Sequence, residues 1–409
     1  MTTDSNIVKA RAVFFIGGFD PKSPPAFYHR IDRENGRFER TWGAKVTRQP
    51  VESRQEDIFC AHFNARNSNG GPDWSTQTDF HYLSIEDIVL GAFARPDYQR
   101  IGRYLISFVD YTITTTGLRF FWHAWRFAMY ALYPLVMLLA SLLLSLMAYS
   151  WVASTSLAYA EYAAIGAFIA CFAFCYQFAL KRGHVLHLMD LWSFSTAYQY
   201  GRRPDMEAKL DRLADEIFEA ASSGKYDEIL VIGHSTGGAL ILDAASRVAK
   251  RHPEYARHSK NVTVLTIGST ALKIGLHPFS GWFRKGLKNL FSTTDTQWVE
   301  FQCVTDLINF HRTNPAKIMG FADDMRSPIH IGNIRVKEMV SRGVYERMKN
   351  NYFRIHYQFV YGNTKRYFYD FPAFCFGPVT LRERLQLDHD KKTPNPYMNS
   401  LMGQVKEVS

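Results

Sequence analysis

The chain has 409 residues, of which 47% are hydrophobic, 15% aromatic and 21% charged. This composition provides enough apolar side chains for a large core and excludes a wholly disordered chain. The net charge of +10 is compatible with nucleic acid, an anionic membrane surface or a basic solvated exterior. Because no nucleic-acid-binding motif accompanies this charge, we expect no nucleic-acid partner.

Further classes of protein are disfavoured by the cysteines, by the absence of common motifs and by the N-terminus. The five cysteines are odd in number and scattered, so neither a disulfide framework nor a zinc site is expected. The HExxH, dinucleotide-binding and phosphate-loop motifs are missing, which predicts a protein with no metal and no cofactor. The polar, acidic N-terminus lacks the basic and apolar regions of a cleavable signal peptide.

Residues 1–118 are expected to form the first part of a soluble domain. The apolar run Ile7–Ile16 predicts a buried strand that ends at Gly17-Gly18. A second strand is predicted at Phe80–Leu83. The domain therefore begins with a strand that leads directly into a glycine turn.

Two long uncharged runs predict a transmembrane helical hairpin within residues 119–183. The expected helices cover residues 127–150 and 162–180, and each is long enough to cross a hydrocarbon core of about 30 Å. Small residues in the second run suit close packing of the two helices. A pair of buried core helices is the alternative, but two such runs separated by so short a link are unusual in a soluble core.

Basic residues predict the orientation of this hairpin. Arg119 and Arg126 precede the first helix, Lys181 and Arg182 follow the second, and the link between the helices has no Lys or Arg. The positive-inside rule then places both flanks in the cytoplasm. We therefore expect an integral protein of the inner (cytoplasmic) membrane, with the lipid membrane as a partner and the soluble parts facing the cytoplasm.

Strands and helices alternate through residues 184–385, and residues 386–409 are expected to be a loose tail. After an amphipathic helix around Met206–Phe218, the apolar runs predict strands at Ile229–Ile232, Val262–Ile267, Trp298–Val304 and Tyr352–Tyr361, with a helix at Gly237–Arg251. This alternation predicts an α/β fold with a mostly parallel, doubly wound sheet that the hairpin interrupts.

The stretch Gly233-His234-Ser235-Thr236-Gly237 lies between a predicted strand and a predicted helix. A tight strand-to-helix turn requires glycines at its two flanking positions and exposes the serine Oγ above the sheet. The positive end of the helix dipole favours negative charge that develops there. Ser235 is therefore the predicted nucleophile, and a glycine-rich turn without catalysis is the alternative.

These residues resemble the nucleophile elbow of lipases and esterases in the α/β-hydrolase superfamily. The resemblance implies an oxyanion hole made by the N–H of Thr236 and by the N–H of Gly18 or Phe19, in the loop after the first strand. It also implies a carboxylate beyond a later strand, a place that Asp306 occupies. The sequence Asp306-Leu307-Ile308-Asn309 is similar to the Asp-Pro-x-Asn often found at this position, with leucine in place of proline.

The catalytic base is expected to be a histidine after Asp306, because the superfamily order is Ser, Asp, His. We predict His356, which ends an apolar part of the expected last strand, and keep His330 as the alternative base. His311 is very close to Asp306 in the chain, and His389 lies between two aspartates in the polar tail.

The resulting prediction is a membrane-anchored serine hydrolase that cleaves a hydrophobic acyl ester through a Ser-His-Asp triad and an acyl-enzyme. A thioesterase or amidase would use the same triad, and a catalytically silent membrane scaffold with a hydrolase fold is the alternative from another class. The aromatic and basic segment Gly281–Phe291 predicts either contact with an anionic leaflet or a solvated helix with one buried face. The oligomeric state is left open.

Overall fold

A computed structural model describes residues 7–70 and 73–387. The chain divides into two compact units, one made of Met1–Val89 with Arg203–Ser409 and the other of Leu90–Arg202. We call the first the hydrolase unit, because it contains the segments that resemble α/β-hydrolases, and the second the helical unit. The expected tail from residue 388 onwards, with His389, lies outside the described residues.

The hydrolase unit contains a nine-stranded sheet in the order β2-β4-β5-β1-β6-β7-β8-β9, with β3 paired to β4. From β5 to β9 every pairing is parallel, whereas β2, β3 and β4 form an antiparallel extension. The strands are β1 (Ala10–Ile16), β2 (Ala44–Arg48), β3 (Glu52–Ser53), β4 (Ile58–Asn67), β5 (Ser75–Leu83), β6 (Glu228–His234), β7 (Val262–Ile267), β8 (Gln297–Cys303) and β9 (His330–Ile334). The predicted α/β fold with a mostly parallel sheet is confirmed.

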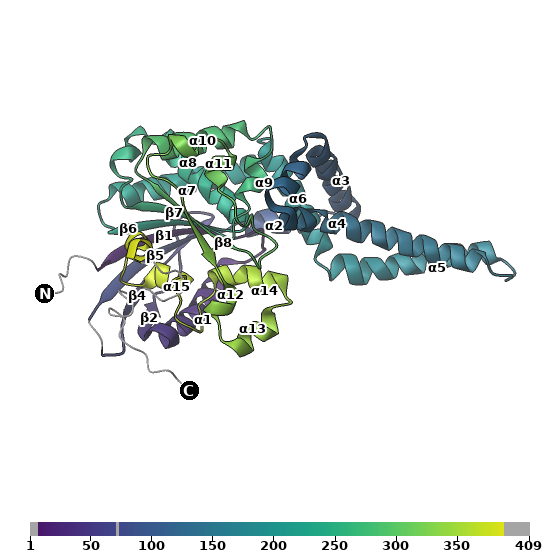
Figure 1. The fold of residues 1–409 in the computed structure, drawn as a ribbon, viewed down its shortest axis with the longest axis horizontal. Coiled ribbons are helices and arrows are strands. Elements are labelled where there is room, and N and C mark those ends of the chain that lie inside the picture. The colour runs from purple at the N-terminus through teal and green to yellow at the C-terminus, as the bar shows by residue number, and fades with distance from the viewer. Residues whose placement is uncertain (1–6, 71–72, 388–409) are drawn as a thin grey trace. The chain divides into compact units, whose positions relative to one another are not determined.

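Helices cover both faces of this sheet (Figure 1). One face packs against α7, α8 and α10, and the other against α1, α15 and the segment that contains α14. The helices of the unit are α1 (Pro24–Trp42), α7 (Pro204–Ser222), α8 (Thr236–Arg251), α9 (Ala271–Gly275), α10 (Gly281–Thr293), α11 (Pro315–Ile318), α12 (Val336–Met339), α13 (Arg342–Met348), α14 (Tyr352–Tyr357), α15 (Phe371–Phe376) and α16 (Leu381–Leu387). Helix α2 (Glu86–Phe93) contains the boundary between the two units.

The predicted last strand at Tyr352–Tyr361 is wrong. This segment forms helix α14 and a 3-10 turn at Gln358–Val360, and the last strand is β9. The Asn351 side chain accepts a hydrogen bond of 2.9 Å from the Arg354 N–H, which caps the first turn of the helix. Ile355 and Phe359, four positions apart, are both buried in the core, so the apolar residues follow helical rather than strand spacing.

Helix α10 contains the aromatic and basic segment Gly281–Phe291. Its residues Phe283, Leu287, Leu290 and Phe291 are buried. Lys288 on the opposite side forms an ion pair of 2.9 Å with Asp324. The segment is therefore a helix with one face buried in the hydrolase unit.

The helical unit contains α3 (Asp97–Ile113), α4 (Thr116–Ala153), α5 (Ala160–Cys175), which continues as a π-helical turn (Tyr176–Lys181), and α6 (Val185–Gln199). Helices α4 and α5 run side by side as a hairpin (Figure 1). Both Thr116–Ala153 and Ala160–Lys181 are long and apolar enough to cross a membrane, and only 17% of the most apolar window in each is buried. The backbone of α4 breaks at Ala124, with φ −156° and ψ 76°.

Candidate active site

Ser235 occupies the turn between β6 and α8. Its backbone has φ 58° and ψ −124°, a strained conformation for a residue with a side chain. Such a conformation costs of the order of 1–3 kcal/mol and persists only where the surrounding structure imposes it. Ser235 is also the only partly exposed residue between Glu228 and Ser246, because all the others in this range are buried. The turn therefore presents one hydroxyl at the surface of an otherwise closed core.

The two glycines of the turn are required by close backbone approaches. A Cβ on Gly233 would lie 2.4 Å from the carbonyl oxygen of Gly237, and a Cβ on Gly237 would lie 2.3 Å from the carbonyl oxygens of Ile16 and Gly17. Real Cβ contacts are not that short, and backbone atoms cannot move aside cheaply. The helix thus packs directly against the end of β1, as the motif predicts.

The loop after β1 lies beside the Ser235 side chain. A Cβ on Gly18 would lie 3.2 Å from Ser235 Cβ and 3.4 Å from Ser235 Oγ. Phe19, the next residue, is buried. Thr236 is the first residue of α8, so its N–H is one of the helix-start donors that have no acceptor within the helix. The structure thus brings the three predicted oxyanion-hole residues to the neighbourhood of Ser235.

Asp306 and His356 form a buried pair. His356 Nδ1 donates a hydrogen bond of 2.7 Å to Asp306 Oδ2. Asn309 Nδ2 donates to the same oxygen at 2.7 Å, and the Ile308 N–H donates to Asp306 Oδ1 at 2.9 Å. The carboxylate is therefore held by three donors, and with its proton on Nδ1 the His356 ring leaves Nε2 as an acceptor.

His234, the residue before the predicted nucleophile, supports the His356 segment. Its Nε2–H donates to the His356 carbonyl oxygen at 3.2 Å, and the two imidazole rings lie 4.7 Å apart. Burial, with repulsion from His356 as a smaller cause, holds the pKa of His234 well below its usual range. A neutral His234 adds no positive charge beside His356.

Gly268 connects the serine turn to the histidine. It follows β7, whose last residue, Ile267, accepts a hydrogen bond of 3.2 Å from the Ser235 N–H. A Cβ on Gly268 would lie 3.3 Å from His356 Cε1, so the ring packs against this glycine. His356 Nε2 is buried and makes no hydrogen bond among the described residues, including none to Ser235.

Tyr357 connects the histidine segment to the glycine loop. Its hydroxyl donates a hydrogen bond of 2.8 Å to Asp20 Oδ2, two residues after Gly18. Burial raises the pKa of the Tyr357 hydroxyl well above its usual range, and the nearby Asp20 carboxylate raises it further. The hydroxyl therefore stays protonated and remains a donor to the loop.

The other histidines lie elsewhere. His330 begins β9 and pairs with Val299, near the start of β8, whereas Asp306 follows the end of that strand. Val299 is four positions before Cys303 along the strand, which corresponds to roughly 13 Å at about 3.3 Å per residue. His330 thus lies at the amino-terminal end of the parallel strands, whereas Asp306 lies beyond their carboxyl end. His311 has no hydrogen bond to Asp306 among the contacts of that carboxylate.

Four residues of this site have no predicted role from the sequence. In the sequence, His234 is only the variable residue before Ser235 in the turn motif. Asn309 is only the last residue of the motif that begins at Asp306. Tyr357 and Asp20 are far apart in the chain and carry no local signal of their pairing. Within residues 7–70 and 73–387, no group of three His, Cys, Asp or Glu side chains could hold a metal ion.

Residues 192–298 match the model of the lipase (class 3) family. The matched part contains β6, Ser235, α8 and β7, and it ends at the start of β8, before Asp306 and His356. No curated protein and no solved structure matches the chain. The family match, together with the sheet, supports a lipase-like ester hydrolase of the α/β-hydrolase superfamily.

Proposed function

We propose that the chain is a membrane-anchored serine hydrolase that cleaves a hydrophobic carboxylic ester with Ser235 as nucleophile. The observation that carries this proposal is the strained Ser235 turn at the end of β6, inside the segment that matches class 3 lipases. The buried Asp306–His356 pair, packed against the glycine that follows β7, supplies the other two members of a triad.

In the proposed reaction, Ser235 Oγ attacks the acyl carbonyl carbon while His356 Nε2 takes the hydroxyl proton. Asp306 holds the imidazole in the required tautomer and stabilises its charged form. The N–H groups of Thr236 and of Gly18 or Phe19 stabilise the oxyanion. His356 then gives the proton to the leaving alcohol. A water molecule, deprotonated by His356, attacks the acyl carbon, and His356 returns that proton to Ser235 Oγ as the bond between Oγ and the acyl carbon breaks and the acid leaves.

The helical unit supports the membrane part of the proposal. Exposed aromatic side chains lie near both ends of the apolar hairpin: Trp122 and Trp125 at one end, and Trp151 and Tyr159 at the other. The 26 positions between Trp125 and Trp151 correspond to roughly 39 Å of helix at about 1.5 Å per residue. This length fits a bilayer of about 40–45 Å including its interfaces, where tryptophan and tyrosine are enriched.

The distribution of basic residues supports the proposed orientation. Every Lys and Arg of residues 90–202 lies outside residues 127–180, at the end of the hairpin that connects to the rest of the chain. The positive-inside rule places that end, and with it Ser235, on the cytoplasmic side of the inner membrane. A substrate delivered from that leaflet would be a hydrophobic ester, and a thioester or amide would react through the same residues.

The proposed triad is tested on the full chain in detergent micelles, with a fluorophosphonate probe and a series of acyl esters of different length. Ser235→Ala should abolish labelling. His356→Ala should lower kcat by about 10⁴-fold or more, the scale of loss seen for triad residues. His330→Ala is the matched control and should change kcat by less than about twofold, within the scatter of substitutions away from a site.

Two outcomes would contradict the proposal. Loss of turnover in His330→Ala, with activity retained in His356→Ala, would assign the base to the other histidine. Folded wild-type protein that the probe does not label would favour the silent scaffold. Thermal unfolding of each variant separates a catalytic loss from a folding defect.

A further inference from the structure

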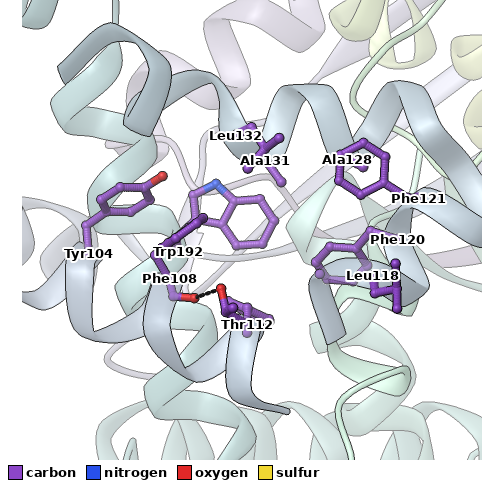
Figure 2. Close-up of a pocket in the computed structure, with 12 residues that line it drawn as sticks. Tyr104, Phe108, Thr112, Leu118, Phe120, Phe121, Ala128, Ala131, Leu132 and Trp192 are labelled. Atoms are coloured by element: carbon purple, nitrogen blue, oxygen red, sulfur yellow. Dashed lines mark hydrogen bonds between the residues drawn. The ribbon is translucent and has the colours of Figure 1, made fainter. Parts of the chain in front are cut away.

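The helical unit contains an apolar cavity of about 260 Å³ that is open on one side and distinct from the Ser235 turn. Figure 2 shows side chains from α3, α4 and α6 that point into it. The lining residues are Tyr104, Phe108, Tyr111, Thr112, Gly117, Leu118, Phe120, Phe121, Ala128, Ala131, Leu132 and Trp192. All of them belong to the helical unit, so the cavity does not depend on how the two units are placed.

The chemistry of the lining disfavours a polar occupant. No charged side chain lines the cavity. The Thr112 hydroxyl donates to the Phe108 carbonyl oxygen at 2.8 Å, and the Tyr111 hydroxyl donates to Gln199 Oε1 at 3.1 Å. The Thr112 and Tyr111 hydroxyls are therefore satisfied within the unit, whereas the Tyr104 hydroxyl is a buried lining group without a hydrogen-bond partner among the described residues. An apolar cavity of about 150 Å³ already stays dry and binds benzene, so this larger one can hold a longer hydrocarbon.

The local structure of α4 explains why the space exists. The helix breaks at Ala124, and lining residues come from both sides of the break. Beyond the break, Ala128 and Ala131 are three positions apart and so lie on one face of the helix. Larger residues at these two positions would fill the cavity, whereas alanine leaves it open.

The cavity is continuous with an exposed apolar surface. Leu118 and Phe121 line the cavity and are 68% and 42% exposed. An exposed apolar patch of this kind on a soluble surface marks an interaction site. The basic residues of the unit gather at this same end of the hairpin, which suits an anionic head group.

We propose that this cavity binds one unbranched hydrocarbon chain of an anionic membrane phospholipid, whose head group stays with the basic residues at the cytoplasmic end of the hairpin. The inference rests on the proposed membrane placement but not on the proposed chemistry of Ser235. A lipid held there would tie α3 to α4 at the break and fix the base of the hairpin.

The test uses the full chain in phosphatidylcholine vesicles that contain phosphatidylglycerol with a diazirine in one acyl chain. After illumination, adducts are mapped by mass spectrometry. We expect adducts on the peptides that line the cavity. Ala131→Phe should reduce these adducts by roughly tenfold, the loss that corresponds to about 1.4 kcal/mol of binding free energy. Ala170→Phe, on the exposed side of α5, is the matched control and should leave them unchanged.

Adducts on the exposed side of α5 distinguish between the results that would contradict the proposal. Adducts on α5 without enrichment at the cavity, or cavity adducts that persist in Ala131→Phe, would overturn the lipid site while leaving the membrane placement intact. Absence of adducts at both places would overturn the membrane placement as well. Equal capture from a diazirine phosphatidylcholine would contradict the anionic head group. Fluorophosphonate labelling of Ser235 in the same vesicles reports the proposed hydrolase activity separately.

Discussion

The hydrolase unit and the helical unit differ in where their apolar side chains lie: most are buried in the core of the first, whereas those of the hairpin in the second are mostly exposed. In β6 and the first turns of α8, every residue except Ser235 is buried, and the strand lies between helices on both faces of the sheet. In α4 and α5 only 17% of the most apolar window is buried, and residues such as Leu143 are more than half exposed.

This difference shows that an apolar run does not by itself reveal its surroundings. Burial in the hydrolase core stabilises by about 25 cal/mol for each Å² of apolar surface removed from water. The exposed hairpin would gain that stabilisation from an apolar solvent, which in the proposed function is a lipid bilayer. Single substitutions in the two units should therefore have different consequences.

The largest expected effect comes from placing one charge in each unit. Ile232→Asp, at a fully buried position of β6, should unfold the hydrolase unit, because an unpaired buried carboxylate costs several kcal/mol. Leu143→Asp, at a position of α4 that is 59% exposed, should preserve fluorophosphonate labelling but weaken membrane insertion by about 2.5–3.5 kcal/mol. Alkaline extraction of membranes and labelling of the extract measure the two effects.

Leu143→Ala is the control for this pair, since it shortens the same side chain without a charge. If Leu143→Asp stays in the membrane fraction like Leu143→Ala, the hairpin does not cross the hydrocarbon core.

A smaller contrast is expected from adding one methyl group in each unit. Gly237→Ala would place its Cβ 2.3 Å from two backbone oxygens and should destabilise the hydrolase unit by about 1–3 kcal/mol, with loss of turnover. Gly166→Ala in α5 meets no heavy atom within 4 Å and should be neutral or stabilising by about 0.5–1 kcal/mol. Denaturation midpoints in detergent compare them. Wild-type activity in Gly237→Ala would mean that α8 does not pack as closely as described.

The remaining prediction concerns pH. Burial raises the pKa of the Glu300 carboxyl on β8 to about 8, although hydrogen bonds from Thr266 and Gln302 oppose the rise. A raised pKa means that the folded state binds the proton more tightly than the unfolded state does. The stabilisation is therefore complete below the ordinary pKa of 4.5 and is lost as the pH rises through about 8.

Thermal unfolding of the full chain between pH 5 and pH 8 measures this dependence. One proton contributes at most about 1.4 kcal/mol per pH unit to the slope. Glu300→Gln should remove that contribution, whereas Glu219→Gln, at an exposed position of α7, should leave it. Equal slopes in wild type and Glu300→Gln would show that Glu300 is ionised in the folded protein.

The central strands could be predicted because their signals are local. β1, β6, β7 and β8 are rich in apolar residues and buried along almost their whole length, as is typical of parallel strands covered on both faces. β4 is not predicted from the sequence because it has no continuous apolar run. It lies in the antiparallel part of the sheet, where buried and partly exposed residues alternate. The α14 segment is short, apolar and aromatic, a composition that also fits a buried strand. Length and capping residues, rather than composition, distinguish a short helix from a strand.

Sequence by itself determined the Ser235 turn, because the turn depends on two nearby glycines. A side chain at either glycine would clash with residues a few positions away or with the adjoining strand. It also determined that two runs in the middle of the chain are apolar enough to cross a membrane. Only the tertiary structure decided which histidine contacts Asp306, since His356 is 50 positions away and reaches it through a helix that packs on the sheet. A contact between distant segments depends on how several elements fold together, and no local pattern encodes it.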